Sequence, residues 1–525
     1  MPFTTLAFAA FFAALFLLYY GLPRRFQWWL LLVGSMVFYG YASLSYLTLL
    51  WGVVLVSFAG TRGMACVYAR RDVYLRENKA VLTREEKKTC KAAAERCARR
   101  FLVGTVLVLL LVLGAFKYTQ FFLDNLFGGL RGLGLIQSQA PILSIILPVG
   151  LSFYVFQTIG YCIDVYREEV AAERNIFRHA LFVSLFAQLL QGPIGRLGRL
   201  APQLFAEHVF DYRQSVFGLQ RILWGVFKKF VIANAIANQI NPCWTAVDDY
   251  PGLICWAAIL VLYAIQLYAD FSGYMDIACG STQMLGVTLD ENFNLPYFAK
   301  SIPDFWRRWH MSLSAWFKDY LFYPILRSDW NARLRKRFQS SRYWATLAPT
   351  SVALAIVWAA TGLWHGASWG YVAWGVYYGV FMIANLAVQP LSDAVHARFP
   401  RLTASRAYGV FQIARTFSIV VVGYSIFKPA DLSVTWSVWS SCTSLNLSVG
   451  LAKALPFFNK TLCVAMGLLF LVDAWHFIKP SVSLRERIHQ LPAVMRWGLY
   501  LSGMLVIVYF GYYGARYDQF EYFKF

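Results

Sequence analysis

Stretches of apolar residues long enough to cross a bilayer recur along this chain of 525 residues. A transmembrane helix needs about 20 predominantly apolar residues, and hydrophobic residues make up 58% of the sequence. The alternating pattern of a transmembrane β-strand is absent. The sequence therefore predicts an all-α, polytopic membrane protein and excludes a soluble multidomain chain.

Lys and Arg residues cluster in alternate connections between the predicted spans. Cytoplasmic loops carry an excess of these cations, so the basic connections are expected to face the cytoplasm. The connections at 118–140, 240–251 and 428–457 carry few cations and are expected on the opposite face, which places both termini outside the cytoplasm. About twelve spans are predicted, near 3–22, 28–44, 47–63, 101–117, 142–163, 213–236, 252–276, 346–365, 368–389, 408–427, 459–478 and 496–514.

Neither an internal repeat nor a long linker divides the chain, so a single membrane domain over residues 1–525 is expected. Residues 68–100 mix acidic and basic side chains at helical spacing, which indicates a charged cytoplasmic excursion; a docking surface for a partner is the alternative. The segments 179–200 and 289–324 have apolar runs that are too short or are interrupted by proline. They are predicted to be re-entrant or interfacial helices.

The formal net charge of +21 would indicate nucleic-acid binding in a soluble protein, but here the cations lie in loops between spans. No nucleic-acid partner is therefore expected. The nine cysteines form no C-x-x-C pair and show no zinc-ligand spacing, so neither a disulfide framework nor a metal site is predicted. The apolar run at 3–22 lacks a basic segment before it and a cleavage site after it, so it is expected to be retained.

His310 lies in the segment DFWRRWHMSLSAWFKDY, where a helix would bring Trp306 and Trp309 close to it. Tryptophan and arginine are common where a helix lies at the membrane interface, so these residues alone would predict only an anchor. Such an anchor does not require a histidine between the tryptophans. His310 is therefore a candidate functional residue, and the interfacial anchor is the alternative.

His365 lies at the end of the predicted span 346–365, about 30 Å along a straight helix at 1.5 Å per residue. The run before it, ATLAPTSVALAIVWAATGLW, holds no charge. An ionisable side chain is costly to bury at such a depth, so its presence predicts a function. A neutral imidazole there could accept a proton, and Gly362 and Gly366 would let a ligand or a second helix come close. The alternative is a core histidine bonded to a neighbouring carbonyl.

Two further pairs of polar side chains lie within or at the end of apolar spans: Asp270 with Asp276, and Gln157 with Asp164. Each could orient a histidine or bind a polar ligand, and each could equally cap a helix end. The other five histidines lie near loops or span ends and are interpreted as bystanders.

A base inside a membrane, beside a narrow polar passage, suits the transfer of an acyl group to an alcohol. The sequence has no G-x-S-x-G elbow, no cysteine in a nucleophile context, no Walker A loop and no dinucleotide fingerprint. Direct transfer, or transfer through a partner, is therefore favoured over a covalent enzyme intermediate. The competing hypothesis is a transporter of a polar solute with the histidines as a proton relay, but the inverted repeats typical of transporters are not found.

At these residues the sequence resembles the membrane-bound O-acyltransferase (MBOAT) family, in particular its bacterial branch of alginate O-acetylation membrane subunits. The terminal FEYFKF also resembles that branch. The segments that carry the resemblance lie between residue 147 and about residue 375, and they are LPVGLSFYVFQTIGYCIDVYR, QLLQGPIGR, YADFSGYMDIACG, ENFNLPY, DFWRRWHMSLSAWFKDYLFYP and TGLWHGASWGYVAWG.

The resemblance implies a ring of helices around a central tunnel, with His365 as the catalytic base and His310 as a second active-site histidine. In relatives of this branch an acyl group from a cytoplasmic thioester crosses the bacterial inner membrane. It then reaches an exported polysaccharide or envelope glycan, often with the help of an extracytoplasmic partner acyltransferase. The further residues expected to line the tunnel or support the site are Trp306, Trp309, Trp364, Asp270, Asp319 and Gln157.

The segment MSLSAWFKDY also resembles the branch that exports D-alanine to teichoic acids, so two donors remain open. Acetyl-CoA is the favoured donor substrate. An acyl carrier protein is the alternative, with D-alanyl transfer to a teichoic-acid-type acceptor. No bound cofactor is expected. The basic run 327–342 could receive either acidic partner or face anionic lipid.

Overall fold

A computed structural model describes residues 1–143, 146–444 and 446–514. These residues form helices and loops, with one isolated antiparallel bridge between Phe293 and Trp309, so the predicted all-α class is confirmed. The terminal FEYFKF lies outside the described residues. The chain divides into two compact units, one made of residues 1–218 and 281–290 and the other of residues 219–280 and 291–525.

The number of helices able to cross a membrane is smaller than the sequence predicted. Seven described helices are long and apolar enough, or eight if α18 (Trp369–Ala387) and α19 (Gln389–Arg398), bent by 49°, form one broken span. The predicted spans at 3–22, 28–44 and 142–163 are helices of only 16, 14 and 16 residues, and 213–236 is interrupted by a π-helix. The expectation of about twelve spans is therefore corrected, while the multi-pass membrane character is confirmed. The seven helices are α3 (Leu44–Glu77), α4 (Arg84–Lys117), α12 (Leu253–Met284), α17 (Arg342–His365), α21 (Arg406–Phe427), α24 (Lys460–Ile478) and α26 (Ala493–Phe510).

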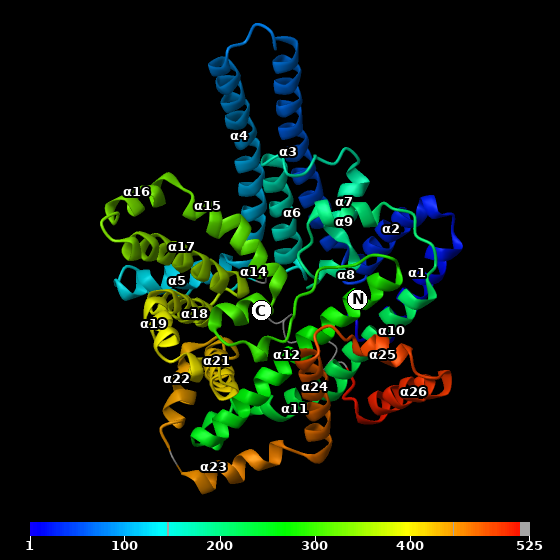
Figure 1. Cartoon of the computed structure of the whole chain (residues 1–525), viewed down its shortest axis with the longest axis vertical. Helices are drawn as coiled ribbons and strands as arrows, with labels where there is room; N and C mark the ends of the chain where they lie inside the picture. Colours follow the sequence, from blue (N-terminus) through cyan, green and yellow to red (C-terminus); the bar gives the residue numbers. More distant parts are fainter. Residues whose placement is uncertain (144–145, 445, 515–525) are drawn as a thin grey trace. The chain divides into compact units, whose positions relative to one another are not determined.

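The first unit is built from the N-terminal helices, several of which are too short to cross a bilayer alone. Its most prominent feature is a pair of long helices, α3 and α4, that lie side by side (Figure 1). Its helices are α1 (Leu6–Gly21), η1 (Arg24–Phe26), α2 (Gln27–Gly40), α3 (Leu44–Glu77), α4 (Arg84–Lys117), α5 (Thr119–Gly132), α6 (Leu151–Tyr166), α7 (Ile176–Ser184), α8 (Phe186–Leu189), α9 (Leu197–Leu204) and the start of α10 (Tyr212–Phe227).

The pair α3 and α4 confirms the predicted helical character of residues 68–100. Each helix has 34 residues, so the charged segment continues the apolar part of the same helix. The turn between them ends in a capping box, in which the Thr83 N–H donates to Glu86 Oε2 (2.8 Å) and the Glu86 N–H donates to Thr83 Oγ1 (3.2 Å). This reciprocal pair of bonds satisfies two of the free N–H groups at the start of α4.

The segment 179–200 contains the end of α7, helix α8, a loop and the start of α9, and almost all of it is buried in the first unit. Its backbone is bonded by Gln157 of α6, whose Nε2 donates to the Phe182 carbonyl (2.6 Å) and whose Oε1 accepts from the Gly195 N–H (3.1 Å). Irregular backbone can be buried in a membrane protein only when such partners are present. Gln157 therefore holds a broken segment together.

The second unit contains the longest buried helix and all but the first two residues of the proline-rich segment 289–324, which is interrupted as predicted. Its helices are the end of α10, η2 (Lys228–Ala233), α11 (Asn234–Ile240), η3 (Asn241–Trp244), η4 (Val247–Asp249), α12 (Leu253–Met284, mostly in this unit), η5 (Pro296–Phe298), α13 (Ile302–Arg308), α14 (Met311–Phe317), η6 (Lys318–Phe322), α15 (Tyr323–Leu326), α16 (Asp329–Arg337), α17 (Arg342–His365), α18, α19, α20 (Pro400–Thr403), α21 (Arg406–Phe427), α22 (Leu432–Ser441), α23 (Leu447–Ala454), η7 (Leu455–Phe457), α24 (Lys460–Ile478), α25 (Leu484–His489) and α26 (Ala493–Phe510).

Helices α17 and α18 approach each other at glycines, which is how small residues let helices pack closely in a membrane. A Cβ atom at Gly375 would collide with the carbonyl oxygen of Trp358 and with the backbone of Gly362. A Cβ atom at Gly379 would press on the Trp358 side chain. The contact between the two backbones therefore requires glycine, and it sets the distance between the residues that the two helices carry.

Replacement of Gly375 by Ala is expected to lower the thermal stability of the detergent-solubilised protein, because the added methyl group would force α17 and α18 apart. Overpacking of this kind costs roughly 1–3 kcal/mol. The matched control is Gly467→Ala in α24, where no atom lies within 4 Å of the added Cβ. The control is expected to be neutral or slightly stabilising, since Gly costs roughly 0.5–1 kcal/mol in a helix. Unfolding midpoints that coincide for Gly375→Ala and the native protein would contradict the close packing.

Candidate active site

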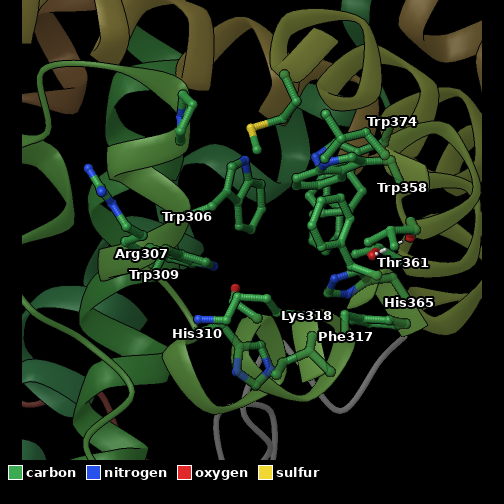
Figure 2. A pocket seen from close by; sticks show the side chains of 18 of the residues that line it. Trp306, Arg307, Trp309, His310, Phe317, Lys318, Trp358, Thr361, His365 and Trp374 are labelled. Carbon is green, nitrogen blue, oxygen red and sulfur yellow. Dashed lines mark hydrogen bonds between the residues drawn. The ribbon is translucent and has the colours of Figure 1, made fainter. Parts of the chain in front are cut away.

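A cavity of about 300 Å³ lies within the second unit (Figure 2). Both histidines singled out in the sequence, His310 and His365, line it. So do two cations, Arg307 and Lys318, whereas no carboxylate lines it within the part of the chain that the structure describes. Most of the wall is aromatic or aliphatic, and it is contributed by α12, α13, α14, η6, α17, α18 and α21.

His310 lies at the break between α13 and α14. Helix α13 begins at the Ser301 cap, whose Oγ accepts from the Asp304 N–H (3.2 Å), and ends before Trp309. His310 then adopts a left-handed backbone (φ 45°, ψ 53°) and α14 starts at the next residue. A non-glycine residue in this region stores roughly 1–3 kcal/mol of strain and persists only where its surroundings impose it.

The imidazole of His310 is only 1% exposed and packs edge-on against Phe271, with 4.9 Å between ring centroids. Burial lowers the pKa of His310 to about 3, because the charged form loses its hydration. The side chain is therefore neutral at physiological pH. A neutral imidazole can accept a proton at one nitrogen while it donates from the other.

His365 is the last residue of α17 and is 5% exposed. Its ring packs edge-on against Trp374 of α18 (4.8 Å between centroids) and Phe427 of α21 (5.3 Å). Trp364 contacts both histidines, with centroids 5.0 Å from His365 and 6.0 Å from His310. Aromatic contacts from three helices thus fix the orientation of the His365 ring.

Of the aromatic residues predicted to belong to the site, Trp306 and Trp309 line the cavity. Sequence reasoning missed Trp358 and Trp374, which continue the same wall. Trp306 stacks edge-on against Trp358 (4.8 Å) and lies 5.7 Å from Trp374. Helical periodicity could have identified Trp358, because it precedes His365 by seven residues and lies on the same face of α17. Trp374 lies in the segment TGLWHGASWGYVAWG that carries the family resemblance, but helical periodicity does not single it out.

Three other predicted site residues are not among those that line the cavity. The carboxylate of Asp270 is 2.6 Å from Lys229 Nζ, and neither Asp270 nor Asp319 is among the residues that line the cavity. Asp319 lies in the π-helix η6. Gln157 belongs to the first unit, where it bonds the backbone of the broken segment. Their functional roles stay predictions.

A buried ion pair joins the π-helix η2 to α12. The side chains of Lys229 and Asp270 are 3% and 2% exposed, and the neighbouring Lys228 Nζ lies 2.6 Å from Asp276 Oδ2. Lys228 also donates to Ser272 Oγ (2.8 Å). A buried charge is tolerated only with such partners, so these lysines explain why α12 keeps two aspartates in an apolar helix.

The network continues to the surface through Arg221. Its Nε donates to Asp276 Oδ1 (2.9 Å), and its two terminal nitrogens donate to the carboxylate of Glu291 (2.7 and 2.5 Å). A bidentate pair of this kind fixes both partners in orientation as well as in position. It therefore fixes the start of the segment that leads to η5 and α13.

Lys318, which the sequence analysis did not propose as a site residue, lines the cavity together with Arg307. It opens the π-helix η6. Irregular π-turns inside helices occur frequently at functional sites. Lys318 and Arg307 are positively charged, and no carboxylate is among the described residues that line the wall. This combination suits a neutral or anionic ligand and a reaction that develops negative charge.

The model of the membrane-bound O-acyltransferase family matches residues 166–426. Among curated proteins, the chain is 33% identical over 449 residues to the probable alginate O-acetylase AlgI of Azotobacter vinelandii, covering 85% of this chain and 79% of that one. It is 33% identical over 450 residues to the probable alginate O-acetylase AlgI of Pseudomonas aeruginosa (85% and 75%). It is 30% identical over 375 residues to the peptidoglycan O-acetyltransferase of Helicobacter pylori (66% and 65%).

Substitution of Asp270 by Ala is expected to destabilise the protein strongly, because it leaves the Lys229 charge buried without its carboxylate. The loss of one partner of a buried pair costs roughly 3–5 kcal/mol. The double variant Asp270→Leu/Lys229→Met removes both charges and should recover most of that loss, as measured by the yield and thermal midpoint of the solubilised protein. A stable Asp270→Ala variant would contradict the pairing. A stable double variant without activity would instead support a role of Asp270 at the site.

Proposed function

The chain belongs to the membrane-bound O-acyltransferase family, and we propose that it transfers an acetyl group from a cytoplasmic thioester to the hydroxyl groups of an exported polysaccharide or other envelope glycan. As a member of that family it is an O-acyltransferase. Two relatives are named after O-acetylation of alginate and of peptidoglycan, which supports a glycan acceptor. The alternative hypothesis of a solute transporter has no such support.

The observation that carries the proposal is the presence of His310 and His365 on the wall of one cavity. In the proposed reaction His365 accepts the proton of the acceptor hydroxyl as its oxygen attacks the carbonyl carbon of the thioester. The new C–O bond forms and the C–S bond breaks. The proton then passes from His365 to the departing sulfur, so the products are an acetyl ester and a free thiol.

His310 serves in this scheme to position the donor or to hand on the proton, for which a neutral imidazole is suited. The aromatic walls exclude water and so protect the thioester from hydrolysis. Lys318 and Arg307 offset negative charge on the carbonyl oxygen or on the donor. These cations fit acetyl-CoA, the favoured donor, and they fit the alternative of an acyl carrier protein that delivers a D-alanyl group to a teichoic-acid-type acceptor.

We place the protein in the inner membrane of a bacterium with both termini on the extracytoplasmic side. This orientation directs the basic connections, including residues 327–342, toward the cytoplasm and the donor. The acyl group would leave on the opposite side, either directly on the glycan or through a partner acyltransferase that passes it to the glycan. Neither a bound cofactor nor nucleic acid has a role in this scheme.

Replacement of His365 by Ala is expected to lower acetyl transfer by roughly 10²- to 10⁴-fold, the usual contribution of a general base. His310→Ala should cause a smaller loss. The measurement follows ester-linked acetyl on the envelope glycan and free CoA released by membranes supplied with acetyl-CoA. All variants are compared at equal abundance in the membrane.

The matched control for these variants is His396→Ala, because His396 is an exposed histidine in the same unit. Its activity should equal that of the native protein. Normal acetylation by both the His365 and His310 variants would rule out the histidine mechanism. The appearance of D-alanyl esters in place of acetyl esters would preserve the reaction class and replace the donor.

A further inference from the structure

The break at His310 leaves the first backbone N–H groups of α14 without partners inside their own helix. An N-terminal residue such as Ser or Asp normally accepts from these groups. The residue in that place is His310, and its side chain makes no capping hydrogen bond. The free N–H groups of α14 must therefore be bonded from elsewhere.

Asn292, from an earlier segment of the chain, supplies the acceptors for the first two backbone N–H groups of α14. Its backbone carbonyl accepts from the Met311 N–H (3.0 Å), and its Oδ1 accepts from the Ser312 N–H (3.0 Å). Its Nδ2 contacts Met275 Sδ of α12 (3.0 Å), and the side chain is 1% exposed. Asn292 thus caps α14 and ties that cap to the helix whose Phe271 packs against His310.

The neighbours of Asn292 are fixed on both sides. Glu291 before it is held by the bidentate contact with Arg221. After it, Phe293 forms the isolated bridge with Trp309, and the Asn294 N–H donates to the Arg308 carbonyl (2.9 Å). The segment 291–294 therefore runs alongside the residues that lead into His310 and holds them in register.

We propose that Asn292 is the positioning residue of His310, acting as a cap supplied from outside the helix that imposes the left-handed backbone on the histidine. When the Asn292 side chain is removed, α14 loses the acceptor that Oδ1 supplies, and His310 relaxes toward an ordinary backbone conformation. The imidazole then leaves its place against Phe271 in the cavity wall. The catalytic importance of the His310 ring position rests on the proposed function, whereas the claim that Asn292 fixes this position does not.

The first experiment measures the placement without any enzymatic assay. The full chain in detergent is treated with diethyl pyrocarbonate, and carbethoxylation of His310 is followed by mass spectrometry, with His365 as the internal reference. In Asn292→Ala the rate of carbethoxylation of His310 should rise about tenfold, since a neutral imidazole reacts once the reagent has access to it. In Asn292→Asp, which retains both acceptors, the rate should remain close to the native value.

Two further variants separate the cap from its surroundings. Met275→Leu removes only the contact to the sulfur and should react like the native protein. If Asn292→Ala does not accumulate, Asn292→Ser takes its place, because its hydroxyl is too short to cap α14 while the backbone acceptor remains. A native rate at His310 in the Ala or Ser variant would overturn the proposal, as would an equal rise in Asn292→Asp.

The second experiment uses acetyl-CoA as the probe and compares kcat with KM. Asn292→Ala should lower kcat by roughly 10- to 100-fold, as misplaced catalytic groups do, with little change in the KM for acetyl-CoA. In the His310→Ala background the same substitution should cause no further loss, because residues that act through one another are not additive. A further loss in that background would overturn the proposal. Normal activity of His310→Ala alone would count against the proposed function. The labelling rates would still decide whether Asn292 positions His310.

Discussion

A break in a buried helix frees backbone groups that water cannot reach, and this protein meets that constraint with buried amide side chains. Gln157 bonds a carbonyl and an N–H of the broken segment in the first unit. Asn292 bonds two N–H groups at the start of α14 in the second unit. An amide suits both places because it can donate and accept at once without carrying a charge. Each of these two irregular segments is therefore stabilised by a single residue.

Buried charges are stabilised in a different way: cations and carboxylates from different helices are buried together as pairs. The pairs Lys229–Asp270 and Lys228–Asp276 each join η2 to α12. These contacts stabilise the packing of η2 on α12 only when both partners of each pair are present, because an isolated buried charge is strongly unfavourable. Glycines at the same crossing, Gly225 and Gly273, let the two backbones come close.

The sequence predicted the helical membrane class and the two histidines for sound physical reasons. A polar residue at the end of an apolar helix is costly, so His365 stood out, and the cavity that it shares with His310 agrees with the hypothesis of a joint site. The number of spans could not be predicted in the same way. Helix α6, which overlaps a predicted span, has only 16 residues and is almost entirely buried among protein neighbours, and composition does not distinguish burial in protein from burial in lipid. Trp374, Lys318 and Asn292 were missed because tertiary contacts alone bring them to the site.

The two π-helices, η2 and η6, begin at Lys228 and Lys318, and each holds one residue more per turn than an α-helix would. Deletion of one residue within such a turn would restore α-helical geometry while the helix on either side keeps its place, so the side chains inside the turn would be redirected. In evolutionary terms, an insertion or deletion of a single residue can bring a side chain to the cavity or withdraw it without any substitution. A one-residue gap at η6 in an alignment of relatives would thus mark a change in the wall of the cavity, even where every neighbouring motif is intact.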